Sequence, residues 1–174
     1  MSKYPSRSKT ERGSGPYKVL IVDDDPDILE SFTQILENNG YHVDSAETGH
    51  EFLTKAKDTV YDIAIVDLKL PDMEGTELLR NMRHMSPQTK KIVITGYPTL
   101  ESAIDAMGSG TDAYLLKPVE PDDFLRVVEE KIREKEESQT LATQTVKATA
   151  NQLPIGAKIS RVDKTSQSKR ERRT

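Results

Sequence analysis

YDIAIVDLKLPDMEG, residues 61–75, decides the fold of this chain, because it joins a buried strand to a helix through an acidic loop. The run Tyr61–Val66 is short and almost continuously apolar, which is typical of a strand buried on both faces. Residues 75–85 follow with apolar side chains at helical spacing. Asp67 stands directly after the strand, so this unit places a carboxylate at the carboxyl end of a sheet strand.

The same succession of strand and helix occurs five times between residues 17 and 137. Strictly alternating strands and helices imply a parallel sheet that is covered by helices on both faces. We therefore predict an α/β fold with a central five-stranded parallel sheet. The expected strands are 17–22, 41–45, 61–66, 91–95 and 113–116, and the expected helices are 26–39, 48–58, 75–85, 99–108 and 121–137.

Capping signals support these helix boundaries. Asp25 is interpreted as the N-cap of the first helix rather than as a ligand, with Pro26 at its first position and Gly40 as its stop. Thr48 and Glu51 have the spacing of a capping box, which predicts the start of the second helix.

Polar residues follow four of the five predicted strands. They are Asp23–Asp25 after the first, Asp67 after the third, Thr95 at the end of the fourth and Lys117 after the fifth. Ligands of open parallel sheets bind at the carboxyl ends of the strands. We therefore expect these carboxylates, the hydroxyl and the ammonium to converge, although they are distant in the sequence.

Carboxylates that share one pocket repel one another unless a cation lies between them. Oxygen-only ligands favour Mg²⁺ or Mn²⁺, while a hydroxyl and an ammonium suit the oxygens of a phosphoryl group. A carboxylate can itself be the nucleophile, which yields an aspartyl phosphate. The pattern thus predicts phosphoryl transfer onto an aspartate. The three histidines, His42, His50 and His84, are interpreted as surface residues rather than ligands.

Four motifs, in order and over about residues 17–135, resemble the receiver domain of two-component response regulators. They are VDDDP at 22–26, VDLKLPDMEG at 66–75, ITGYPTLESAIDAM at 94–107 and YLLKP at 114–118. The resemblance implies a doubly wound (βα)5 sandwich of the flavodoxin-like type. The motifs most resemble those of receivers of the nitrogen-regulation type, which continue into an ATPase domain. The phosphate loop GxxxxGK[ST] of that ATPase is absent from this sequence. We therefore expect a stand-alone response regulator, which is not an enzyme beyond its own phosphorylation and dephosphorylation.

The resemblance assigns roles around the phosphorylated residue. It implies that Asp67 is the phospho-acceptor, that Asp24 binds Mg²⁺ directly and that Asp23 orients a metal-bound water. The backbone carbonyl of Lys69 is implied as a further metal ligand. The phosphoryl donor is then a sensor histidine kinase or a histidine phosphotransfer protein.

The resemblance also implies a switch. Thr95 is expected to bind the phosphoryl oxygen, Lys117 to pair with it and with Asp67, and Tyr114 to rotate in response. The Lys117–Pro118 peptide bond is expected to be cis. The face built by 97–107, 112–117 and 121–135 is expected to dock a downstream protein or to form a phosphorylation-dependent homodimer.

Composition divides the chain into a globular centre and two polar ends. Residues 17–137 hold 26 acidic and 13 basic side chains, whereas residues 1–16 and 138–174 carry net charges of +3 and +6. We expect both ends to be disordered. There is no cysteine, no apolar run long enough for a membrane span and no secretory leader, so we expect a cytoplasmic protein without membrane insertion.

Three alternative functions stay open at this point. A haloacid-dehalogenase-like phosphatase also uses a strand-end aspartate, and Asp23-x-Asp25 matches its D-x-D signature, so phosphate would then appear on Asp23. A receiver fold whose phosphorylation is not used would be a pure binding module. The basic cluster at 169–173 is a candidate for nucleic-acid binding, although such tails are more often solvated.

Overall fold

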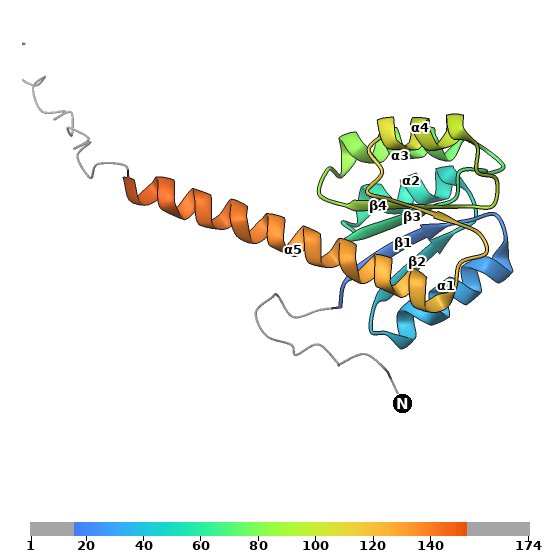
Figure 1. Cartoon of the computed structure of the whole chain (residues 1–174), viewed down its shortest axis with the longest axis horizontal. Coiled ribbons are helices and arrows are strands. Elements are labelled where there is room, and N and C mark those ends of the chain that lie inside the picture. Colours follow the sequence, from blue (N-terminus) through green and yellow to red (C-terminus); the bar gives the residue numbers. More distant parts are fainter. Residues whose placement is uncertain (1–15, 153–174) are drawn as a thin grey trace, which may run out of the picture. The chain divides into compact units, whose positions relative to one another are not determined.

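The computed structural model of the chain describes residues 16–152 (Figure 1). Five strands and five helices alternate along these residues, which confirms the predicted fold class. The strands are β1 (Lys18–Val22), β2 (His42–Ala46), β3 (Ile63–Val66), β4 (Lys90–Thr95) and β5 (Ala113–Leu116). The helices are α1 (Pro26–Asn38), α2 (Gly49–Asp58), α3 (Gly75–Met85), α4 (Leu100–Gly108) and α5 (Pro121–Gln152).

The five strands form one parallel sheet in the order β2-β1-β3-β4-β5. This is the strand order of flavodoxin-like sheets, and it places β2 at an edge. Val22 of β1 is opposite Val66 of β3, and Val66 is opposite Val93 of β4. The residues that follow β1 and β3 therefore leave the sheet side by side.

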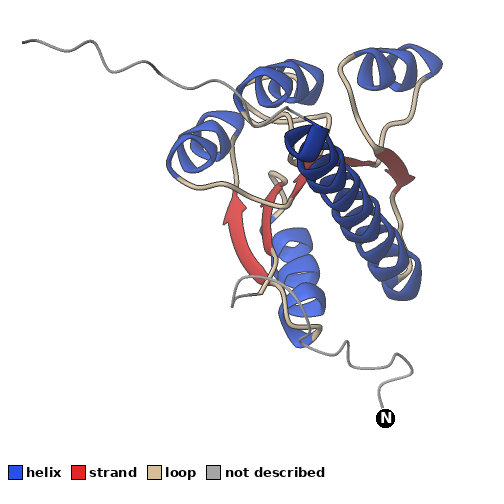
Figure 2. Ribbon diagram, turned by 90° about the vertical axis from the view of Figure 1, so that its left-hand side faces the viewer, coloured by secondary structure: helices blue, strands red, loops and turns tan. Residues whose placement is uncertain are grey.

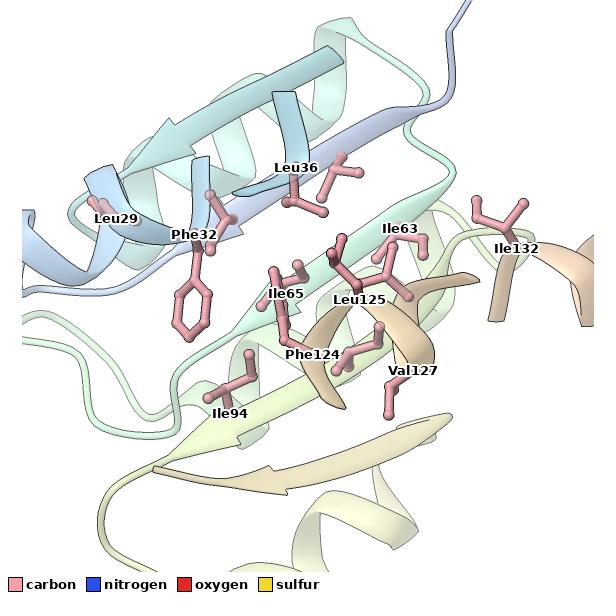
Figure 3. Close-up of a cluster of buried hydrophobic side chains, with 14 residues drawn as sticks. Leu29, Phe32, Leu36, Ile63, Ile65, Ile94, Phe124, Leu125, Val127 and Ile132 are labelled. Carbon is pink, nitrogen blue, oxygen red and sulfur yellow. The ribbon is translucent and has the colours of Figure 1, made fainter. Parts of the chain in front are cut away.

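Helices cover the sheet on both faces, as Figure 1 and Figure 2 show. Helices α1 and α5 pack on one face, and Figure 3 shows the apolar cluster between them and the sheet. The rings of Phe32 and Phe124 meet there with their centroids 4.5 Å apart. The contact joins the two helices over the middle of the sheet, close to the loop that carries Lys117.

The other face is covered by α2, α3 and α4, with Phe52, Leu78, Leu79 and Met82 fully buried. Helix α4 is the least embedded of the three, since Ala106 is its only buried residue. Because both faces are covered, the inner strands have apolar residues at consecutive positions, which is why they could be recognised in the sequence.

The predicted caps are largely confirmed. The Asp25 carboxylate accepts the N–H of Asp27, and Thr48 Oγ1 accepts the N–H of Glu51. The capping box at α2 is only half formed, because the Glu51 carboxylate accepts the N–H of Glu47 rather than that of Thr48. A complete capping box that the sequence reading missed begins α4, between Thr99 and Ser102.

Helix α5 is longer than predicted, since it continues to Gln152 rather than ending near residue 137. The expectation of disorder is therefore wrong for residues 138–152. No glycine or proline occurs between Pro121 and Pro154, so nothing in this stretch breaks a helix. The described side chains from 139 to 148 are all exposed.

The chain divides into two compact units, one through Ser138 and one from Gln139. The expectations for residues 1–15 and for 153–174, including the basic cluster at 169–173, lie outside the described residues. Within residues 16–152, no helix combines the length and the apolar character that crossing a bilayer requires.

Candidate functional site

The carboxyl ends of four strands meet at one edge of the sheet and carry the polar residues predicted there. Asp23 follows β1, Asp67 follows β3, Thr95 ends β4 and Lys117 follows β5. Hydrogen bonds join side chains that are up to 94 positions apart in the sequence. The parallel sheet thus brings Asp23, Asp67 and Lys117 together from three loops, as the strand-end rule anticipates, with Thr95 at the end of β4.

Asp67 is almost completely buried, with 6% of its surface exposed, so its carboxylate needs partners inside the protein. Oδ1 accepts the backbone N–H of Lys69 at 3.0 Å, and Oδ2 accepts a hydrogen bond from Lys117 Nζ at 2.6 Å. Its own N–H donates to the carbonyl of Val22 on the neighbouring strand. Both oxygens of the carboxylate are therefore held in fixed directions.

Lys117 Nζ also donates to Asp23 Oδ2 at 2.5 Å, so one ammonium is shared by two buried carboxylates. Burial alone would lower the pKa of Lys117. The hydrogen bonds and negative charges of Asp23 and Asp67 outweigh burial and raise this pKa. Lys117 is therefore a permanent cation in the pocket. The Lys117–Pro118 peptide bond that follows is cis.

Three carboxylates, Asp23, Asp24 and Asp67, each offer an oxygen within 4.8 Å of the others. Asp23 is buried, and its Oδ1 accepts the N–H of Asp25, whereas Asp24 is exposed. Burial raises the pKa of the Asp23 carboxyl, although the hydrogen bonds from Lys117 and Asp25 oppose this. With one ammonium, the three carboxylates leave a formal charge of −2. An all-oxygen donor set of this charge fits a hard dication such as Mg²⁺.

Thr95 and Tyr114 lie on the neighbouring strands β4 and β5. Thr95 is completely buried, and its Oγ1 accepts the N–H of Tyr97 at 3.2 Å. Tyr114 is partly buried against the cluster under α3 and α4, and its hydroxyl lies 3.5 Å from Ser102 Oγ of α4. The tyrosine ring therefore connects the last strand to the most weakly embedded helix.

The loop from β3 to α3 is folded tightly, which the sequence reading missed. A Cβ on Gly75 would lie 2.3 Å from the carbonyl oxygen of Asp67, so only glycine permits this approach. The N–H of Gly75 donates to the carbonyl of Leu68, and Lys69 Nζ pairs with both carboxylate oxygens of Glu74. The signal available in the sequence was a glycine at the first position of a helix that directly follows an acidic loop.

An apolar hollow of about 390 Å³ adjoins the pocket on its α1 side. Ile28 and Phe32 of α1 line it together with Lys117, Pro118 and Val119. Ile28 and Phe32 also belong to the apolar side of α1 that packs against the sheet. The hollow is formed by the loop after β5, and the position of that loop relative to α1 could not be inferred from periodicity.

The three histidines are exposed, in agreement with their interpretation as surface residues. None belongs to the one candidate metal cluster found among the described residues. His50 nevertheless has a specific partner, because its Nδ1 lies 2.5 Å from Oδ2 of Asp72 in the loop from β3 to α3.

A doubly wound sheet with an acidic pocket and a lysine at its carboxyl edge is the arrangement found in receiver domains. Residues 19–129 match the response regulator receiver domain family, and the chain belongs to that family. Receiver domains are signalling phospho-acceptors of two-component systems rather than conventional enzymes, and they bind Mg²⁺ at an acidic cluster such as the one described above. They interact with histidine kinases and downstream effectors.

Individual relatives agree with this assignment. The chain is 33% identical over 107 residues to the alginate biosynthesis transcriptional regulatory protein AlgB of Pseudomonas putida, which covers 62% of this chain. The matched parts span about a quarter to a half of such curated relatives, 24% of AlgB and 47% of the cell cycle response regulator CtrA of Brucella ovis.

Solved structures of receivers have the same fold. A CheY-like receiver domain protein from Methanospirillum hungatei is 46% identical, with a TM-score of 0.71, over 71% of this chain and 99% of its own. The beryllofluoride-activated NtrC4 receiver domain dimer is 33% identical, with a TM-score of 0.65, over 68% of this chain and 98% of its own.

Proposed function

We propose that Asp67 accepts a phosphoryl group from a phosphohistidine of a donor protein, and that the chain uses this modification to control a protein contact. The observation that carries the proposal is the pocket in which Asp67 meets Asp23, Asp24 and Lys117. It combines a nucleophilic carboxylate, acidic neighbours that suit a dication and a fixed cation.

In the proposed reaction a carboxylate oxygen of Asp67 attacks the phosphorus atom. A phosphorus–oxygen bond forms, the phosphorus–nitrogen bond to the donor imidazole breaks, and the imidazole leaves with the bonding electron pair and takes up a proton. Lys117 is already within hydrogen-bond distance of Asp67 and supplies positive charge to the phosphoryl oxygens. The Lys69 N–H holds the acceptor carboxylate in place.

We propose Asp24 as the direct carboxylate ligand of Mg²⁺, together with Asp67 and the carbonyl of Lys69, while Asp23 binds through water. The bound dication would neutralise the charge that gathers on the phosphoryl oxygens. The exposed position of Asp24 suits a ligand that is reached from solvent, and the buried position of Asp23 beside Lys117 suits the indirect role.

The proposed switch runs from Thr95 to Tyr114. The phosphoryl group adds about two negative charges and new acceptor oxygens, and the Thr95 hydroxyl is the donor placed at the end of the adjacent strand. When Thr95 turns toward the phosphoryl group, Tyr114 can rotate into the space beside it and leave Ser102, its present neighbour at 3.5 Å. Phosphorylation then shifts an existing equilibrium between two positions of α4.

Exposed apolar residues support α4 and β5 as the output face. Leu100, Ile104 and Met107 of α4 are 80%, 59% and 72% exposed, and Leu116 of β5 is 52% exposed. Their spacing places the three α4 residues on one side of the helix. Exposed apolar side chains that gather on one side of a helix favour a protein interaction site. We propose that a downstream protein or a second copy of the chain binds there.

Incubation with Mg²⁺ and phosphoramidate, followed by mass spectrometry, tests the acceptor. The wild type is expected to gain one phosphoryl group, Asp67→Asn to gain none and the neighbouring Asp25→Asn to remain competent. Phosphate on Asp23 would support a dehalogenase-type phosphatase. A wild type that is never modified, by phosphoramidate or by phosphorylated donor proteins, would show a pure binding module.

A further inference from the structure

Asp72 connects the loop after the acceptor strand to a different helix. It lies between Asp67 and α3, yet its carboxylate binds the N-terminus of α2. Oδ1 accepts the N–H of Gly49 at 2.8 Å, and Oδ2 accepts the N–H of His50 at 2.9 Å. The His50 ring adds a contact from Nδ1 to Oδ2 at 2.5 Å. One side chain thus makes three polar contacts across 22 or 23 positions of sequence.

The backbone N–H groups in the first turn of α2 therefore find hydrogen-bond acceptors on two residues, Thr48 and Asp72. Thr48, its own cap, accepts the N–H of Glu51, and Asp72 takes two further N–H groups that a helix start leaves without partners. A carboxylate also interacts favourably with the positive end of the helix. Burial raises the pKa of the Asp72 carboxyl, but the hydrogen bonds from the His50 ring and from the N–H groups of His50 and Gly49 outweigh burial and lower this pKa to about 2. Asp72 is therefore charged throughout the physiological range.

Apolar packing reinforces the same contact. Gly49 is buried under Met73, and a Cβ at Gly49 would lie 2.5 Å from the Met73 Cγ and Sδ atoms. The tip of the loop, Asp72 and Met73, is consequently docked on α2 by both a carboxylate and a side-chain contact.

The other end of the loop belongs to the acceptor site. The N–H of Lys69 holds Asp67 Oδ1, and a bridge between Lys69 and Glu74 closes the loop. The backbone between these two residues is short, so a displacement of its tip reaches Lys69 directly. The geometry points to Asp72 as a positioning residue. We propose that it fixes the loop against α2 so that the Lys69 backbone stays aligned with Asp67 and with a bound Mg²⁺; the proposal rests on the function proposed above.

The test compares Asp72→Ala with Thr48→Ala in the full chain. Both variants remove a cap from α2, but only the first releases the loop. We expect Asp72→Ala to raise the dissociation constant of Mg²⁺, measured by calorimetric titration, about tenfold, the scale seen when groups that orient metal ligands are removed. Hydrogen exchange in residues 68–74 should also become faster. Thr48→Ala should change neither quantity, and Asp72→Asn, which keeps one acceptor oxygen, should lie between the two.

Equal Mg²⁺ affinity and equal exchange in Asp72→Ala and Thr48→Ala would overturn the proposal. If Asp72→Ala does not fold, His50→Ala removes only the ring contact. It should then give a smaller change in the same direction, and no change in either quantity would again overturn the proposal. Neither measurement uses phosphorylation, so a wild type that binds Mg²⁺ but is not phosphorylated on Asp67 would contradict the proposed function alone.

Discussion

The ammonium of Lys117 lies 2.6 Å from Oδ2 of Asp67, so the acceptor carboxylate is already paired with a cation from the last βα loop. The same ammonium binds Asp23 at 2.5 Å. Lys117 therefore neutralises part of the acidic pocket when no dication is bound. Because Mg²⁺ and Lys117 act on the same carboxylates, the stability of the domain and its affinity for Mg²⁺ are coupled.

Lys117→Met is expected to lower the free energy of unfolding without Mg²⁺ by roughly 2–4 kcal/mol, because it leaves two buried carboxylates without their cation. Saturating Mg²⁺ should restore most of this loss, since the dication interacts with the same oxygens. Urea unfolding with and without Mg²⁺ measures both effects. Lys91→Met is the matched control. Lys91 is 5% exposed and donates to the Thr89 carbonyl away from the pocket. Mg²⁺ should therefore not restore the free energy of unfolding that Lys91→Met loses.

Asp23→Asn is expected to have the opposite effect on the metal-free domain. Burial raises the pKa of Asp23, which means that its negative charge at neutral pH is unfavourable in the folded state. The neutral amide should therefore stabilise the metal-free protein and weaken Mg²⁺ binding. Thermal unfolding measures the stability of the metal-free protein, and calorimetric titration of the same sample measures the dissociation constant of Mg²⁺. An unchanged Mg²⁺ affinity would contradict a role for Asp23 in the metal site.

The pH dependence of stability should contain a contribution from Asp72. Its pKa is lowered from 3.8 to about 2, so the folded state favours the charged form. Stability from this group is therefore complete above pH 4 and is lost as the pH falls toward 2. Asp72→Asn should be less stable than the wild type at pH 7 by about 1 kcal/mol, the scale of a helix cap. The difference in stability between the variant and the wild type should disappear near pH 2. A difference that stays constant with pH would contradict this contribution of Asp72.

The site could be predicted because parallel strands deliver their last residues to one edge. Asp23, Asp67, Thr95 and Lys117 each follow or end an apolar run, and no knowledge of loop conformation was needed to bring them together. The contact between Asp72 and His50 could not be predicted in this way. It depends on where the tip of a loop meets the start of a helix, and neither residue is marked by periodicity.

The error in α5 has a different cause. The segment from 138 to 152 lacks an apolar stripe, so a reading based on burial ends the helix where the core contacts end. Helix continuation depends also on the absence of residues that break it, and Ser138, Thr140 and Gln144 have only modest helix penalties. The boundary prediction gave too much weight to amphipathicity.

The apolar patch on α4 can be tested without disturbing the fold. Ile104→Glu changes a side chain that is 59% exposed, so the free energy of unfolding should change by no more than about 0.5 kcal/mol. Any beryllofluoride-dependent self-association or partner binding, measured by light scattering and by pull-down, should be lost. Val60→Glu is the control, because Val60 is 76% exposed but lies in the loop between α2 and β3. Equal effects of the two substitutions would contradict the proposed face.

Gly75→Ala should be the most damaging single-methyl change near the site. The new Cβ would lie 2.3 Å from the Asp67 carbonyl oxygen and 2.7 Å from Leu68 Cα, both of which are backbone atoms that cannot rotate away. We expect a loss of about 3 kcal/mol in the free energy of unfolding, together with weaker Mg²⁺ binding, because relief of the clash must displace either α3 or the acceptor. Gly108→Ala is the matched control at the last residue of α4, where a Cβ meets no atom within 4 Å. This substitution should stabilise the domain by about 0.5 kcal/mol through helix propensity and leave Mg²⁺ binding unchanged. Chemical unfolding of both variants distinguishes a steric effect at the acceptor from a general effect of replacing glycine.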